Sequence, residues 1–142
     1  MKKLVSNTPI LSILTVLFLL SCASCAKKIT FLTSPVVPAA RGNVQVKKDN
    51  NKNYVIHVSI MDLAEVERLS PPKKTYVVWM VSEYEIAKNI GQINSKMSIA
   101  KNLKASFQTV SSTKPIKIFL TSEDDPTVFS PTGQIVLSTD NF

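Results

Sequence analysis

The sequence has very few of the residues from which small domains build disulfides, metal sites and acid–base pairs. Only two cysteines occur in 142 residues, Cys22 and Cys25, and the one histidine is His57. Because both cysteines lie within the first 25 residues, the rest of the chain can form no disulfide, and a Cys/His zinc site would lack ligands. We therefore expect the chain to fold by packing alone, with no metal and no other cofactor.

Long apolar runs are also absent, apart from one near the start. Residues 10–20 are predominantly apolar and follow the basic segment Met1-Lys2-Lys3. At ~1.5 Å rise per residue this run makes a helix of roughly 17 Å, well short of the ~30 Å hydrocarbon core of a bilayer. Its length matches the apolar part of a secretory signal peptide.

The apolar run ends in Leu19-Leu20-Ser21-Cys22, which resembles the lipobox of bacterial lipoproteins. In that pattern, a leucine three residues before the cysteine and a small residue just before it position the cysteine for acylation and cleavage. The resemblance implies a signal peptide over residues 1–21, an acyl chain such as palmitate on Cys22, and a location in the bacterial cell envelope, facing the periplasm or the outside. The alternatives are an uncleaved anchor or cleavage before Cys25. Acylation or removal of Cys22 would leave its C-x-x-C spacing to Cys25 without a redox role.

The positive charge is modest and scattered. The sequence has a net charge of +7, and removal of Lys2 and Lys3 with the leader would leave +5. The lysines form isolated pairs without an arginine cluster or interleaved aromatic residues, so we expect no nucleic acid partner. Lys27 and Lys28 lie a few residues after Cys22, where they could contact acidic lipid headgroups.

About 120 residues follow the leader, enough for one domain and too few for two. Residues 22–40 contain Pro35 and Pro38 and are interpreted as a lipidated N-terminus and tether. The β-branched run Ile29-Thr30-Phe31 could add an edge strand, where proline nearby is tolerated. The domain itself is expected over residues 41–142.

Alternation of apolar and polar residues predicts a hairpin of residues 43–47 and 54–60. Asp62 and Glu65 are expected to cap a short helical turn. Residues 76–81 have no polar side chain on either face, so this strand must be covered on both sides.

Further strands are expected at residues 91–94, 116–121 and 134–138. Residues 97–107 stay ambiguous, because their helical spacing of apolar residues conflicts with a polar composition typical of irregular structure. Six or seven short strands with polar turns predict an all-β fold, an antiparallel immunoglobulin-like β-sandwich.

Four segments are distinctive in their composition and in their order along the chain: Tyr76–Val81, Ile90–Ile93, Ile118–Glu123 and Ser130–Leu137. In this order they resemble the extracytoplasmic C-terminal domain of anti-sigma-K factors, over about residues 41–139. The resemblance implies a β-sandwich that binds or senses something outside the cytoplasm. It does not imply direct binding of a sigma factor, because we find no counterpart of the family's sigma-binding helical domain or of its membrane-spanning helix. Asp124-Asp125-Pro126 also replaces the family's glycine-rich turn.

The candidate site residues each have an ordinary structural interpretation. Tyr76 and Trp79 fall on opposite faces of one strand, so at least one belongs to the core; we expect Trp79 there, with a binding role as the alternative. The acidic group Glu123-Asp124-Asp125 is interpreted as a solvated turn with a possible binding role, because the remaining ligands of a calcium loop are missing. His57 lies in the polar register of its strand without a recognised nucleophile, which favours a solvated imidazole over a catalytic base.

The sequence thus predicts a non-catalytic envelope lipoprotein that binds or senses. Its expected partners are the lipid bilayer, through acylated Cys22, and an envelope protein. One alternative is a component of a sigma/anti-sigma signalling system that acts through a membrane partner. The other is a hydrolase that uses scattered Ser and Asp residues with His57.

Overall fold

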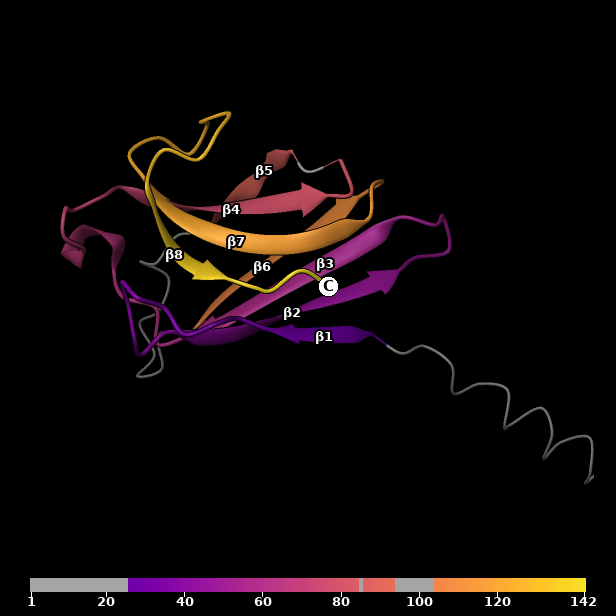
Figure 1. The fold of residues 1–142 in the computed structure, drawn as a ribbon, viewed down its shortest axis with the longest axis horizontal. Helices are drawn as coiled ribbons and strands as arrows, with labels where there is room; N and C mark the ends of the chain where they lie inside the picture. The colour runs from indigo at the N-terminus through magenta and orange to yellow at the C-terminus, as the bar shows by residue number, and fades with distance from the viewer. Residues whose placement is uncertain (1–25, 85, 94–103) are drawn as a thin grey trace, which may run out of the picture.

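Two antiparallel sheets of four strands each stack face to face in the computed structural model, which describes residues 26–84, 86–93 and 104–142 (Figure 1). The first sheet has the order β1 (Lys27–Thr30), β2 (Arg41–Lys48), β3 (Tyr54–Met61), β6 (Ala105–Ser111). The second has the order β5 (Ala87–Ile93), β4 (Thr75–Ser82), β7 (Pro115–Glu123), β8 (Gln134–Ser138). Apart from one 3₁₀ helix, η2 (Val66–Arg68), the described residues contain no helix, and so none that could cross a membrane. The predicted signal peptide, Cys22 and Cys25 lie outside the described residues.

The strand order confirms the all-β, immunoglobulin-like prediction. If β1 is left aside, β2, β3 and β6 occupy the places of strands A, B and E of that fold. Strands β4, β7 and β8 take the places of C, F and G, with β5 added beside β4 as in variable-type domains. There are eight strands rather than the expected six or seven.

The eighth strand comes from the segment that we expected to be a tether. Strand β1 pairs with β2 at the edge of the first sheet, as the run at residues 29–31 suggested. After it, Phe31 and Val37 are buried in the core, and Leu32 N–H donates to the Ser138 carbonyl of the other sheet at 2.8 Å. Ser34 Oγ accepts a 2.9 Å hydrogen bond from the Val37 N–H and shapes the turn. The packed domain therefore begins near residue 27, and not at residue 41.

The structure assigns part of one ambiguous segment and contradicts one local expectation. Of the ambiguous segment, residues 97–103 lie outside the described residues and 105–107 belong to β6, in which Phe107 and Thr109 point inward and the neighbouring Ser106, Gln108 and Val110 are exposed. The helical turn begins at Glu65 without a side-chain cap. Asp62, expected as the cap, instead has φ 57° and forms a 2.9 Å ion pair with Arg41.

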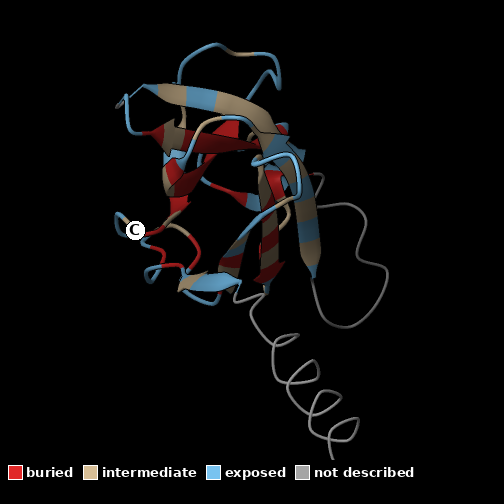
Figure 2. Ribbon diagram, turned by 90° about the vertical axis from the view of Figure 1, so that its right-hand side faces the viewer, coloured by how far each residue is buried: buried red, intermediate tan, exposed pale blue. Residues whose placement is uncertain are grey.

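The main core lies between the sheets, where Figure 2 shows the buried residues gathered. Alternate residues of each strand supply it, among them Val44, Ile56, Tyr76 and Leu120. Gly91 lies at a bulge between β4 and β5 with φ 143°, and a Cβ there would lie 2.5 Å from the ring of Phe107. The glycine thus lets an aromatic side chain of the first sheet pack directly onto the backbone of the second.

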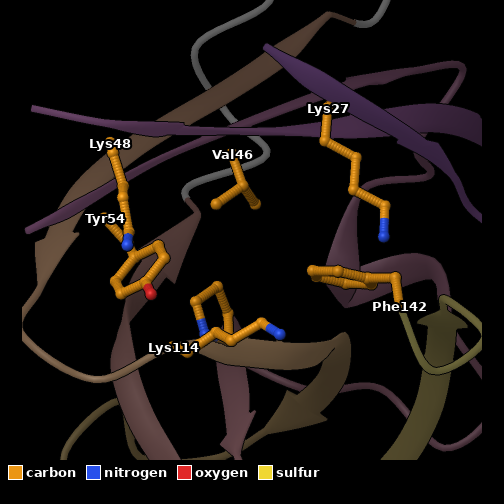
Figure 3. Close-up of a pocket in the computed structure, with 7 residues that line it drawn as sticks. Lys27, Val46, Lys48, Tyr54, Lys114 and Phe142 are labelled. Carbon is orange, nitrogen blue, oxygen red and sulfur yellow. The ribbon is translucent and has the colours of Figure 1, made fainter. Parts of the chain in front are cut away.

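Two hollows on the described surface differ in the chemistry of the residues that line them. One lies between the sheets at the end of the sandwich where β1 begins, and is lined by lysines and aromatic residues (Figure 3). The other lies beside the β7–β8 loop, residues 124–133, and is lined mainly by apolar side chains.

Candidate functional site

A second apolar cluster covers the outer face of the β5-β4-β7-β8 sheet. It is centred on Val77 and Trp79 of β4 and Phe119 of β7, and the half-buried Val128 of the β7–β8 loop packs against it. Trp79 and Phe119 are directly paired across the strands, with stacked rings whose centroids are 6.2 Å apart. This explains why β4 has no polar face. The main core covers one side of the strand, and the second cluster, to which the β7–β8 loop contributes Val128, covers the other.

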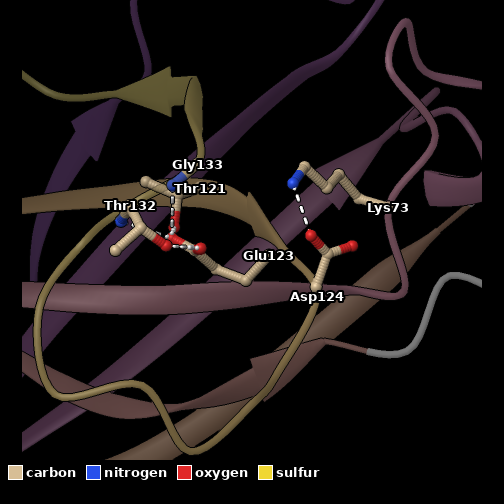
Figure 4. Close-up of polar contacts among 6 residues, drawn as sticks. All are labelled: Lys73, Thr121, Glu123, Asp124, Thr132 and Gly133. Carbon is tan, nitrogen blue, oxygen red and sulfur yellow. Dashed lines mark hydrogen bonds and ion pairs between the residues drawn. The ribbon is translucent and has the colours of Figure 1, made fainter.

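The β7–β8 loop is fastened to the sheet through the carboxylate of Glu123, which is 1% exposed (Figure 4). Oε1 accepts hydrogen bonds from Thr121 Oγ1 at 2.6 Å, Thr132 N at 3.1 Å and Gly133 N at 3.0 Å. Oε2 accepts one from Thr132 Oγ1 at 2.6 Å. Trp79 Nε1 donates to Thr121 Oγ1 at 2.8 Å, so the network joins the indole to the far end of the loop.

This hydrogen bonding sets the charge state of Glu123. Burial on its own raises the pKa of the carboxyl group, but the hydrogen bonds from Thr121, Thr132 and Gly133 together outweigh it, and the pKa lies below its ordinary value. Glu123 is therefore ionised at neutral pH, and its charge is satisfied by four donors. The pKa of the exposed Asp125 is also lowered, by hydrogen bonds from the backbone and hydroxyl of Thr127.

Three further contacts fix the middle of the loop. Asn89 of β5 donates from Nδ2 to the carbonyls of Pro126 and Val128, at 2.9 and 3.0 Å. Asp125 Oδ1 accepts from Thr127 N at 2.8 Å, which closes a turn of the kind that aspartate favours. The ion pair of Lys73 Nζ with Asp124 Oδ2, at 2.6 Å, ties the start of the loop to the segment before β4.

The fastened loop presents a large apolar side chain to solvent. Phe129 is 97% exposed, and near it Ile86 is 73% and Tyr84 68% exposed. These three residues help to line a hollow of about 660 Å³, which also includes Val128 and the β5 residue Ala87. Its size is in the range of ligand-binding hollows.

The structure separates the predicted site residues instead of bringing them together. Tyr76 and Trp79 are both fully buried, on opposite faces of β4, so neither presents a binding surface. The Tyr76 hydroxyl donates to the Ala64 carbonyl at 2.9 Å, and burial raises the pKa of Tyr76 to about 12. Of the acidic group, Asp124 and Asp125 are exposed as expected, whereas Glu123 is buried and has a structural role.

The exposed residues around the hollow had not been singled out from the sequence. Phe129 and the preceding Val128 form a two-residue apolar pair among polar turn residues, and a pair this short gives no periodic signal. Asn89 lies at the β4–β5 bulge, where only the fold shows that its amide reaches the loop.

Chemically reactive side chains are sparse in the described part of the chain. His57 is half-buried on β3, where its cross-strand neighbours are Gln45 and Gln108. Across residues 26–84, 86–93 and 104–142, no group of three or more His, Cys, Asp or Glu side chains is placed to hold a metal ion. What the site offers is a shaped apolar surface on a rigid support.

Comparison with known protein-family models, curated proteins and solved structures gave no match. The resemblance to the outer domain of anti-sigma-K factors therefore stays a prediction from the sequence.

Proposed function

We propose that this protein is a non-catalytic binding module of the bacterial cell envelope, held on a membrane by a lipid on Cys22. In this proposal the fastened β7–β8 loop and its neighbours Tyr84 and Ile86 form the binding surface for an apolar segment of an envelope protein. We call this surface the Phe129 face.

The observation that carries the proposal is the exposure of Phe129 on a loop that is otherwise tightly held. Large apolar side chains in water are unfavourable, and three of them beside one hollow are typical of an interaction site. Aromatic residues are also enriched among those that supply most of the energy of protein interfaces.

The fastening of the loop supports binding in a second way. Glu123, Asn89 and Asp125 fix its conformation before any partner arrives. A surface that is already ordered loses less conformational entropy on association, so more of the contact energy appears as affinity.

The anchor is tested by acyl labelling of cells that express the chain. The wild type should incorporate a labelled fatty acid and stay in the membrane fraction through high-salt washing, and Cys22→Ser should lose the label. Label that depends on Cys25 instead would show that the other cysteine is acylated.

The binding surface is tested by native electrophoresis of membranes solubilised in mild detergent. We expect the wild type to migrate in a complex larger than the monomer, and Phe129→Ser with Ile86→Ser to migrate as the monomer. Leu32→Ser is the matched control, because Leu32 is also an exposed large apolar residue, 49% exposed, but lies after β1 and does not line the hollow. A wild type that migrates as a monomer, or a complex that survives both changes, would argue against the Phe129 face.

A further inference from the structure

The lysine-lined hollow at the end of the sandwich has a composition suited to an anion. It has a volume of about 330 Å³, and the ammonium groups of Lys27, Lys48 and Lys114 surround it (Figure 3). The remaining lining residues are Val46, Tyr54, Pro115 and Phe142. None of the seven side chains is acidic.

Two of the lysines are held against aromatic rings at the wall of the hollow. Lys27 Nζ lies 5.5 Å from the ring centroid of Phe142, and Lys48 Nζ lies 5.2 Å from that of Tyr54. Both are cation–π contacts, which orient an ammonium group without neutralising it. The three ion pairs found among the described residues involve Arg41, Arg68 and Lys73, and so none of the lysines of this hollow.

Three positive charges around one hollow repel one another, and a bound anion would relieve that repulsion. Phosphate groups are bound by lysine as a point charge, without demanding the planar geometry of arginine. The rings, with Val46 and Pro115, add an apolar wall beside the charges. The chemistry thus fits a phosphate that carries an apolar substituent better than a bare inorganic ion.

The position of the hollow indicates where such a ligand would come from. Figure 1 shows that β1 begins at the same end of the sandwich as the end of β2, the start of β3 and the start of β7. Lys27 is five residues after Cys22, a separation that spans at most about 18 Å of extended chain. If Cys22 is acylated, as the proposed function holds, the hollow stays within that reach of the membrane surface.

We propose that the hollow formed by Lys27, Lys48 and Lys114 binds the phosphate of an anionic phospholipid headgroup and so holds this end of the sandwich against the membrane. The inference that the ligand comes from the membrane rests on the proposed function. The inference that the hollow binds a phosphodiester does not.

Titration calorimetry on the full chain in an uncharged detergent tests the site independently of the anchor. The probes are dihexanoyl-phosphatidylglycerol, dihexanoyl-phosphatidylcholine and inorganic phosphate. We expect saturable binding of the phosphatidylglycerol, with much weaker binding of the other two. Each of Lys27→Ala, Lys48→Ala and Lys114→Ala should raise the Kd about five-fold, equivalent to ~1 kcal/mol per lysine.

Lys28→Ala is the matched control, because it removes the same charge from the neighbouring position of β1 but does not line the hollow. It should change the Kd less than two-fold, and Lys114→Arg should bind nearly as the wild type does. Inorganic phosphate binding as tightly as the phosphatidylglycerol would show a site for free phosphate and overturn the headgroup assignment. No saturable binding, or binding equally weakened by Lys28→Ala, would overturn the site itself. Absence of acyl label on Cys22 would contradict only the anchor.

Discussion

Replacing Glu123 by glutamine tests whether the buried carboxylate holds the β7–β8 loop. Glutamine keeps the size of the side chain and can place its amide oxygen where Oε1 accepts from Thr132 N and Gly133 N. Its amide nitrogen can donate to Thr132 Oγ1, so the change removes chiefly the charge. Hydrogen bonds to a charged group contribute about 1.5–3 kcal/mol each, against about 1 kcal/mol for neutral ones. We therefore expect Glu123→Gln to lower the free energy of unfolding by roughly 1–3 kcal/mol at pH 7.

The pH dependence makes this prediction specific. Because the pKa of Glu123 is lower in the folded protein than its ordinary value of 4.5, the unfolded chain binds more protons in this range, and the carboxylate stabilises the fold at higher pH. That stabilisation is complete above pH 4.5 and is lost as the pH falls through the lower value of the folded state. The difference between wild type and Glu123→Gln should therefore be largest near neutral pH and shrink as the solution is acidified.

Urea denaturation followed by circular dichroism, at several pH values between 7 and 2.5, measures this difference. Glu65→Gln is the control, because it removes the same charge from an exposed carboxylate paired with Arg68, and it should change stability by less than about 0.5 kcal/mol. The reasoning is refuted if Glu123→Gln costs no more than Glu65→Gln at pH 7, or if its cost is undiminished at the lowest pH.

Three further changes probe other parts of the fold. Trp79→Ala should lower the free energy of unfolding by about 3–5 kcal/mol in urea denaturation, because the indole is fully buried in the outer cluster; a cost below 1 kcal/mol would show that it is exposed. Deletion of residues 26–40 should cost several kcal/mol, because it removes β1 and the buried Phe31; a thermal midpoint equal to that of the full chain would place this segment outside the domain. Phe129→Ser should change stability by less than about 0.5 kcal/mol, since the ring has almost no contact to lose, and a larger loss would show that Phe129 packs within the fold.

The sequence predicted strands best where apolar and polar residues alternate along the chain. Residues 43–47 and 54–60 alternate, and they form most of β2 and β3. The unbroken apolar run in β4 correctly predicted a strand covered on both sides, although the sequence did not identify the cover. That cover includes the β7–β8 loop, whose polar composition suggested a solvated turn.

Strand β6 was not predicted because its inward-pointing residues are not all apolar. Phe107 points inward, but so does Thr109, while the apolar Val110 is 57% exposed. Alternation is therefore broken, and the helical spacing that ends at Phe107 competed with it.

Glu123 shows why site roles are harder to predict than strands. Next to Asp124 and Asp125 it belongs to an acidic run, yet alternation along β7 places it on the same face as Phe119 and Thr121. A buried carboxylate is tolerated only when donors surround it, and two of these donors lie nine and ten residues later in the chain. Only the closed loop brings those groups together.

The central claim is that the Phe129 face meets a protein partner in the cell envelope, and site-specific photo-crosslinking in intact cells tests it most directly. A benzophenone amino acid at position 129, and in a parallel strain at the exposed control position 32, is activated by light and the products are separated by mass. We predict a discrete adduct with one protein from position 129, and no such adduct from position 32. Adducts with lipid alone at position 129, or the same protein adducts from both positions, would contradict the claim.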